Sequence, residues 1–321
     1  MKAIAYYLIL LSILLSGSAS SQSYLFKRFA ANPIISQASL PGKDGENING
    51  PSLIKAPDWL PNKLGNYYLY FAHHGGTYIR LAYADQLDAS WNIYDKGTLR
   101  LSDCRVCRNH IASPDVFVDH QNKEIVLYFH APVDTNYSAR GQYSFRATSK
   151  DGINFKVDTT ILGISYFRVF QWKNNHYAIA RTGQLYRSAD GGRTFESGPN
   201  PFDKVQSKSN YLRHAAVKVD GDRLLVFYSN IGDKPERILL SVLQLNDDWS
   251  TWTPGKPVTV VKPEKDYEGV NEPLLASEVG AHYGPVRQLR DPAFYEENGK
   301  WYLVYSTAGE KALAIGELIR Q

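Results

Sequence analysis

The sequence predicts an all-β fold, a five-bladed β-propeller, from three observations. Short aromatic strands recur along the chain, turn residues separate them, and no long window shows the periodicity of an amphipathic helix. The same order of strands occurs five times. One blade alone cannot bury both faces of its sheet, so the blades are expected to stack around an axis. A β-sandwich also has many short strands, but it lacks a five-fold repeat with one internal order.

Each expected blade has an inner strand, then an aromatic strand, then a third strand. The inner strands are expected at residues 51–55, 114–118, 168–172, 215–219 and 292–295. The pairs that follow them are expected at 66–72 with 78–83, 124–130 with 143–148, 176–180 with 184–188, 223–229 with 237–242, and 300–306 with 312–316. Turn signals such as Asn174-Asn175 and Asn298-Gly299 connect the strands. The stretch 252–290 is expected to carry a long loop.

Two short segments support this division into blades. Residues 188–195, Ser-Ala-Asp-Gly-Gly-Arg-Thr-Phe, resemble the Asp-box turn of sialidase-like propellers, and residues 149–155 are a looser copy. The carboxylates of Asp190 and Asp151 are expected to accept hydrogen bonds from turn amides while the aromatic residue packs inward. We therefore expect a structural role for both.

The first residues predict export. Lys2 precedes an apolar run over residues 3–15, and small residues occupy positions 16–20. This pattern predicts a signal peptide at 1–20 and a single propeller domain at 21–321, secreted or periplasmic. The run is too short for a stable membrane anchor, and no membrane partner is expected. The net charge of +4 is scattered along the chain, so nucleic acid is not an expected partner either. We expect a monomer.

The chain has two cysteines, Cys104 and Cys107. In an exported protein this spacing favours a local disulfide that pins a loop. A zinc site normally needs four ligands, and His110 is the only further ligand nearby. No cofactor is expected, although the histidines near the ring centre leave a central cation open.

The repeats resemble the five-bladed propeller glycosidases of the arabinanase–levansucrase–invertase type, including glycoside hydrolase family 43. The resemblance covers about residues 30–319 and rests on the Pro step that opens an inner strand, followed by YYLYFA at 67–72 or WYLVYS at 301–306. It also includes IRLAYAD at 79–85, which leads to Ser90-Trp91. The resemblance implies hydrolysis of a glycosidic bond by carboxylates on successive inner strands: a base, a carboxylate that tunes pKa, and a general acid.

These three carboxylates do not carry over residue by residue. The first inner strand has Gly50 before its Pro where the family has Asp, the second has Ser113, and the third has Tyr166-Phe167-Arg168 where the acid Glu is expected. Only the fifth keeps an acid before the Pro, Asp291. The fold therefore carries over better than the mechanism.

Polar residues at the starts of inner strands, Asn49 and Ser113 among them, and at the ends of the next strands are expected to line a central funnel. Asp291 and Asp115 are the candidate catalytic carboxylates, since 113 and 115 share a strand face, and His214 or Glu236 is the candidate proton donor. Glu268, Glu272 and Glu310 are weaker alternatives. The candidate substrate-binding residues are His73, His74, His110, His130, Arg168, Arg213, Arg287, Arg290 and Tyr283.

Three function classes stay open for a carbohydrate ligand. The first is a glycoside hydrolase acting on an oligo- or polysaccharide, including an anionic uronate or sulfated glycan that converging arginines would bind. The second is a glycan-binding propeller without catalysis. The third is a polysaccharide lyase that uses His or Tyr as the base and Arg to neutralise a carboxylate.

Overall fold

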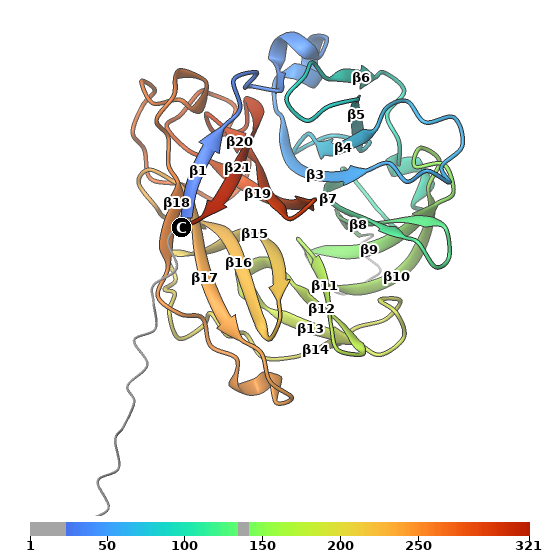
Figure 1. Cartoon of the computed structure of the whole chain (residues 1–321), viewed down its shortest axis with the longest axis vertical. Coiled ribbons are helices and arrows are strands. Elements are labelled where there is room, and N and C mark those ends of the chain that lie inside the picture. The colour runs from blue at the N-terminus through green and yellow to red at the C-terminus, as the bar shows by residue number, and fades with distance from the viewer. Residues whose placement is uncertain (1–23, 134–140) are drawn as a thin grey trace, which may run out of the picture.

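The computed structural model describes residues 24–133 and 141–321, which form five antiparallel sheets around one axis (Figure 1). This arrangement confirms the predicted five-bladed propeller. The predicted signal peptide at 1–20 lies outside the described residues. The helices of the described ranges are short 3-10 turns, and none is long and apolar enough to cross a membrane.

The first four blades follow one another along the chain, each with its inner strand first. Blade one contains β3 (Asn49–Lys55), β4 (Tyr67–Ala72), β5 (Arg80–Ala84) and β6 (Asn92–Tyr94). Blade two contains β7 (Ala112–Asp119), β8 (Glu124–Pro132), β9 (Gln142–Ser149) and β10 (Lys156–Ile164). Blade three contains β11 (Arg168–Trp172), β12 (Asn175–Ile179), β13 (Leu185–Ser188) and β14 (Glu196–Ser197). Blade four contains β15 (Tyr211–Asp220), β16 (Arg223–Ile231), β17 (Ile238–Gln244) and β18 (Val258–Val261).

Blade five closes the ring by joining both ends of the described chain. It contains β19 (Arg290–Glu297), β20 (Lys300–Thr307), β21 (Ala312–Arg320), β1 (Tyr24–Arg28) and the two-residue β2 (Ile35–Ser36). The strand β1 pairs antiparallel with β21, and Tyr24 lies opposite Arg320 (Figure 1). The first described strand is thus the outer strand of the last blade, so hydrogen bonds of a sheet hold the ring closed.

The connections carry six 3-10 turns in the described part of the chain. They are η1 (Gln37–Ser39), η2 (Gly42–Gly45), η3 (Leu101–Asp103), η4 (Arg181–Gly183), η5 (Trp249–Thr251) and η6 (Asp266–Glu268). The predicted long loop is present between β18 and β19 and contains η6.

The strands next to the axis are the ones that the sequence predicted as inner strands. They are β3, β7, β11, β15 and β19 (Figure 1). In three of them the residue before Pro has a left-handed backbone: φ is 57° at Gly50, 50° at Ser113 and 49° at Asp291. The pairing with the next strand shifts register at each of these steps. Such a bulge breaks the strand alternation and re-aims the side chain of the extra residue.

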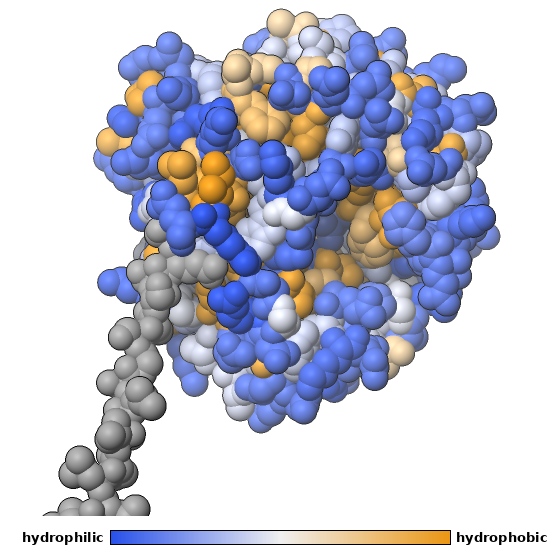
Figure 2. All heavy atoms as spheres, in the orientation of Figure 1, coloured by the Kyte–Doolittle hydropathy of each residue, from blue (hydrophilic) through white to orange (hydrophobic). Residues whose placement is uncertain are grey.

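The blades pack through apolar side chains on both faces of each sheet. In β20, every residue after Lys300 is buried. Tyr68 and Tyr70 of β4 are also buried, and the Tyr70 hydroxyl donates to the carbonyl of Gly152 in the next blade. Continuous burial on both faces explains why these strands read as unbroken aromatic runs rather than as an alternating pattern. Figure 2 shows mostly hydrophilic side chains on one face of the ring, with smaller apolar patches.

The two Asp-box segments have the predicted structural role. The Asp190 carboxylate accepts hydrogen bonds from the backbone N–H groups of Arg193 and Thr194, both at 3.0 Å. Asp151 accepts from the N–H groups of Ile153 at 2.9 Å and Asn154 at 2.7 Å. Both carboxylates therefore shape turns at blade edges.

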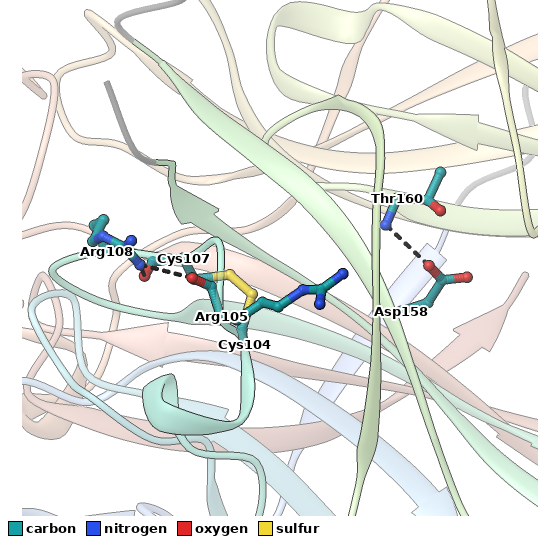
Figure 3. Close-up of a disulfide and its surroundings, with 6 residues drawn as sticks. All are labelled: Cys104, Arg105, Cys107, Arg108, Asp158 and Thr160. Carbon is teal, nitrogen blue, oxygen red and sulfur yellow. Dashed lines mark hydrogen bonds between the residues drawn. A yellow bond between two sulfur atoms is a disulfide. The ribbon is translucent and has the colours of Figure 1, made fainter. Parts of the chain in front are cut away.

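The predicted disulfide is present between Cys104 and Cys107 (Figure 3). Both cysteines are buried, and their Cα atoms are 5.3 Å apart. Cys107 also forms a bridge with Val133 after β8. The disulfide therefore fixes the loop that leads through His110 into the inner strand β7.

Candidate active site

A pocket lies on the propeller axis, and every blade contributes to it. The empty space in and around it is about 320 Å³, a figure that includes the open solvent at its mouth. Its lining residues are Asn49, His74, His110, Ala112, Ser113, His130, Tyr166, Arg213, Asp291 and Glu310. This pocket occupies the place of the predicted central funnel.

Residues at corresponding steps of the inner strands supply much of the lining. Ser113 and Asp291 have the left-handed backbone described above, and Tyr166, just before β11, has the same conformation with φ 69°. Arg213 lies at the register shift of β15. In blade one the position is Gly50, and a Cβ atom there would lie 3.0 Å from the Cα atom of Ser113. Blade one therefore brings no side chain from this step into the pocket.

Asp291 is a buried carboxyl with an altered pKa. Asp291 as a whole is 7% exposed to solvent. Burial raises its pKa to about 6, and the nearby charge of Glu310 acts in the same direction. Arg213 and Arg290 oppose the rise, but burial prevails. Asp291 is therefore substantially protonated in mildly acidic solution.

Glu310 follows β20 and lines the same pocket with the opposite shift. Arg290 Nη1 donates to Oε1 at 2.9 Å, and Asn49 Nδ2 donates to Oε2 at 3.1 Å. His74 Nδ1 is 3.5 Å from Oε2. Burial alone would raise the pKa of Glu310, but the hydrogen bond to His74 and the charge of Arg290 outweigh it and lower the pKa to about 2. The pocket thus holds two carboxyls whose pKa values are moved in opposite directions, so that between about pH 2 and pH 6 Glu310 is ionised while Asp291 is largely protonated.

Glu236 lies behind the pocket, fully buried between two arginines. Its Oε1 accepts from Arg213 Nε at 2.9 Å, and its Oε2 is 3.0 Å from Arg290 Nε. The hydroxyls of Ser229 and Ser277 donate to the same carboxylate. We expected Glu236 at a turn by the funnel mouth as a proton donor. The structure corrects this placement, because Glu236 is not in the pocket lining and both of its oxygens are held by the two arginines and the two hydroxyls.

Asp115 and Arg168 also lie outside the pocket lining, where they brace the inner strands. Arg168 is buried, and it donates from Nη1 to the Pro114 carbonyl at 2.9 Å and from Nε to the Ala215 carbonyl at 3.0 Å. The Asp115 carboxylate accepts from the N–H of Val169 at 2.8 Å. The expected roles as catalytic carboxylate and substrate clamp do not fit these positions. The bulge after Ala112 is the reason, because residues 113 and 115 do not share a face across it.

His214 is fully buried and does not line the pocket. Its Nε2 lies 3.1 Å from Arg168 Nη2, and its Nδ1 lies 3.7 Å from Asp291 Oδ1. Burial lowers the pKa of His214 well below its usual range, and the charge of Arg168 adds to the effect. A neutral, enclosed imidazole does not match the expected role of a proton donor to substrate.

Three of the four remaining predicted histidines line the pocket: His74, His110 and His130. Burial lowers the pKa of His130 well below its usual range, and His110 adds to this shift. The ring of His130 lies 4.4 Å from that of Tyr166, edge to face. His73 is not in the lining, and its ring lies 6.5 Å from that of Tyr283.

One of the four predicted arginines is in the pocket lining. Arg213 lines the pocket, whereas Arg168, Arg287 and Arg290 do not. Tyr283 is 56% exposed on the long loop and is likewise outside the lining. Within residues 24–133 and 141–321, no group of three or more His, Cys, Asp or Glu side chains is arranged to hold a metal ion.

Two residues in the lining were not candidates in our sequence analysis, Tyr166 and Ala112. Tyr166 stands where the resemblance implied an acid, and no other signal in the sequence pointed to it. Burial raises the pKa of its phenol to about 12, so it is a neutral hydrogen-bonding group in the pocket. An aromatic residue with positive φ is uncommon and marks a position held by its surroundings.

Solved structures of similar fold are glycosidases. A glycosyl hydrolase from Bacteroides ovatus matches with a TM-score of 0.64 and 9% identity, over 91% of this chain and 92% of that one. CoXyl43, a GH43 β-xylosidase/α-arabinofuranosidase from a compost microbial metagenome, matches with a TM-score of 0.59 and 13% identity, over 85% and 91% of the two chains. These matches confirm the predicted resemblance in fold to five-bladed glycosidases.

Comparison of sequences gives a nearer relative. No family model matches the chain. The uncharacterized protein R118 of Acanthamoeba polyphaga mimivirus is 36% identical over 317 residues, which cover 89% of this chain and 88% of that protein. The chain therefore belongs to the same family as R118 of Acanthamoeba polyphaga mimivirus.

Proposed function

We propose that this protein is a glycoside hydrolase in which Asp291 is the general acid and Glu310 is the ionised carboxylate. One observation carries the proposal: two carboxyl groups line one pocket, and their environments move their pKa values apart. Two carboxyls with opposed protonation states are what acid-assisted cleavage of a glycosidic bond requires. The fold shared with known glycosidases agrees with this chemistry.

The reaction follows from these two states. Asp291 gives its proton to the glycosidic oxygen, so the leaving sugar departs as a neutral alcohol. The negative charge of Glu310 stabilises the positive charge that develops at the anomeric carbon. Water then adds to that carbon, and its proton passes to a carboxylate.

The other lining residues suit a sugar ligand. Asn49 and Ser113 offer hydrogen bonds to sugar hydroxyls, and the ring of Tyr166 offers an apolar face. The finer proposal of an anionic glycan rests on Arg213, the predicted arginine that reaches the pocket. Its charge is already shared with Glu236, so we propose a neutral sugar at the cleavage site with any anionic group next to Arg213.

The sequence pattern at residues 1–20 supports export. We therefore propose that the substrate is an extracellular or periplasmic oligosaccharide or polysaccharide.

The test is sugar release from a panel of neutral, uronate-containing and sulfated oligosaccharides. Asp291→Asn and Glu310→Gln are each expected to lower the rate by about 100-fold or more. Asp88→Asn, which changes an exposed Asp, is the matched control and is expected to keep the wild-type rate. Tight glycan binding with no turnover by the wild type would instead identify a binding propeller. Products with a new double bond, seen by ultraviolet absorbance, would identify a lyase.

A further inference from the structure

A chain of polar side chains links four consecutive blades near the axis. Asp115 of β7 lies 3.9 Å from Arg168 of β11, measured from Oδ1 to Nη1. Arg168 Nη2 lies 3.1 Å from Nε2 of His214 on β15. His214 Nδ1 lies 3.7 Å from Oδ1 of Asp291 on β19. The chain thus runs from Asp115, a side chain outside the pocket lining, to the proposed general acid.

The hydrogen bond from Arg168 determines which ring nitrogen of His214 carries the proton. A guanidinium has N–H donors and no acceptor, so His214 Nε2 must accept its hydrogen bond. The imidazole is neutral because it is fully buried beside a cation. Its single ring proton is therefore on Nδ1, and this nitrogen has no hydrogen-bond partner among the described residues. The carboxylate oxygen Oδ1 of Asp291 lies 3.7 Å from it.

We propose that His214 is a positioning residue for Asp291: Arg168 fixes its tautomer so that its Nδ1–H faces the carboxylate that Asp291 becomes. This inference rests on the proposed function, in which Asp291 loses its proton to the leaving oxygen. A hydrogen bond to the charged form of an acid is stronger than one to its neutral form. The contact at 3.7 Å is therefore expected to shorten as Asp291 ionises, as catalytic hydrogen bonds often do.

The other charges around this pair are already engaged. Asp291 is influenced by Glu310, Arg213, Arg290 and Glu236, and His214 by Arg168, His130 and Arg213. Arg213 and Arg290 donate to Glu236 and Glu310, as described above. On the other side of Asp291, the Ser306 hydroxyl lies 3.5 Å from Oδ2. The Nδ1–H of His214 is thus a buried donor in reach of Asp291 that has no competing acceptor among the described residues.

Two variants separate the two nitrogens of His214. In His214→Asn, the amide nitrogen can occupy the place of Nδ1, so a donor toward Asp291 is kept while the partner of Arg168 is lost. In His214→Gln, the amide oxygen can reach toward Arg168, so that contact is kept while the donor toward Asp291 is lost. A purely structural role through Arg168 predicts that His214→Asn is the damaging change. The positioning role predicts the reverse.

The measurement is the pKa of the Asp291 carboxyl, followed by carbon-13 NMR with Asp291→Asn for assignment. His214→Gln is expected to raise this pKa by about one unit, because the donor that favours the ionised form is gone. His214→Asn is expected to stay within about 0.3 units of the wild type. Equal shifts in both variants, or a shift in His214→Asn alone, would overturn the inference. This titration needs no turnover, so it can succeed even when the proposed hydrolase activity is absent.

Two further readouts make the test complete. In the wild type, the nitrogen-15 signals of the His214 ring are expected to show a proton on Nδ1 and none on Nε2, and the opposite tautomer would overturn the inference without any variant. Where a hydrolysed glycoside is in hand, His214→Gln is expected to lower kcat about tenfold with KM little changed. It is also expected to move the alkaline limb of the pH profile upward by the same one unit.

Discussion

Replacing Glu236 by Gln is expected to destabilise the protein and to acidify Asp291. The side chain is fully buried and meets both Arg213 and Arg290. The substitution keeps the size of the side chain but removes the charge that balances these two cations. It therefore leaves the buried Arg213 without its carboxylate partner, whereas Arg290 keeps its ion pair with Glu310.

The magnitude follows from the cost of breaking a buried ion pair by removing one partner, which is about 3–5 kcal/mol. The hydroxyls of Ser229 and Ser277 still meet the Gln side chain, so we expect a loss near the lower end, about 3 kcal/mol. For a domain of this size, that corresponds to a fall in Tm of roughly 5 °C. The charge of Glu236 also helps to raise the pKa of Asp291, so this pKa is expected to fall in the variant.

The assay is reversible unfolding in urea, supported by thermal melting. Glu264→Gln is the matched control: Glu264 pairs with Arg28 at 3.2 Å but its side chain is 48% exposed, so the same substitution should change stability by less than about 1 kcal/mol. A loss below about 1 kcal/mol in Glu236→Gln would refute the assignment of Glu236 as the anion that holds the two arginines.

Four further outcomes are expected. Cys104→Ser should lower the unfolding free energy by about 2 kcal/mol, because the disulfide closes a short loop. Reduction of the wild type should give the same change in urea unfolding. No change in either experiment would contradict a stabilising role of the disulfide. Asp190→Ala should lower the unfolding free energy by about 1–2 kcal/mol, because the turn hydrogen bonds are lost, while sugar release stays at the wild-type rate. A lower rate of sugar release without a loss of stability would oppose a structural role. Tyr166→Gly should remove the strained positive φ and change the unfolding free energy by less than about 1 kcal/mol. It should nevertheless weaken glycan binding, measured by calorimetry, about tenfold. Unchanged binding would show that Tyr166 does not contact the glycan. Burial raises the pKa of Asp291 to about 6, so between about pH 4 and pH 6 the folded form holds more protons than the unfolded form. The part of the unfolding free energy that depends on Asp291 should therefore fall as pH rises from about 4 to 6. The same pH dependence of stability in the wild type and in Asp291→Asn would contradict the raised pKa.

The blades were predictable because their signals are local. The aromatic runs, the Pro steps and the turn residues each act within a few residues, and the five inner strands lie where these signals placed them. The closure of the ring was not predicted. Strand β1 pairs with β21 at the other end of the chain, and nothing in residues 24–28 alone names that partner.

The site was predictable in its composition more than in its assignments. Asn49, His74, His130, Arg213 and Asp291 reach the pocket as their positions at strand ends indicate. Asp115 and His214, which do not reach the lining, come after the register shifts of β7 and β15, where the extra residue ends the strict alternation of side chains.

The sequence was also a poor guide to which carboxylates reach the pocket. Glu310 ranked low in sequence because it follows a strand in a turn, and its low pKa depends on His74 and Arg290, which are distant in the chain. Glu236 was expected at a turn by the funnel mouth, as an alternative to His214 for the proton donor, whereas the two arginines that bury it come from β15 and β19. Contacts between side chains of different blades determine both outcomes, and the sequence of one strand does not reveal them.

The separation of the two pocket carboxyl pKa values is the most direct test of the proposed chemistry. Carbon-13 NMR titration of the wild type, with Asp291→Asn and Glu310→Gln for assignment, measures both values in one protein. Our account predicts that Asp291 titrates near pH 6 and that Glu310 stays ionised well below the usual range of a Glu. Titration of both groups together near pH 4 would contradict the assignment of acid and ionised carboxylate.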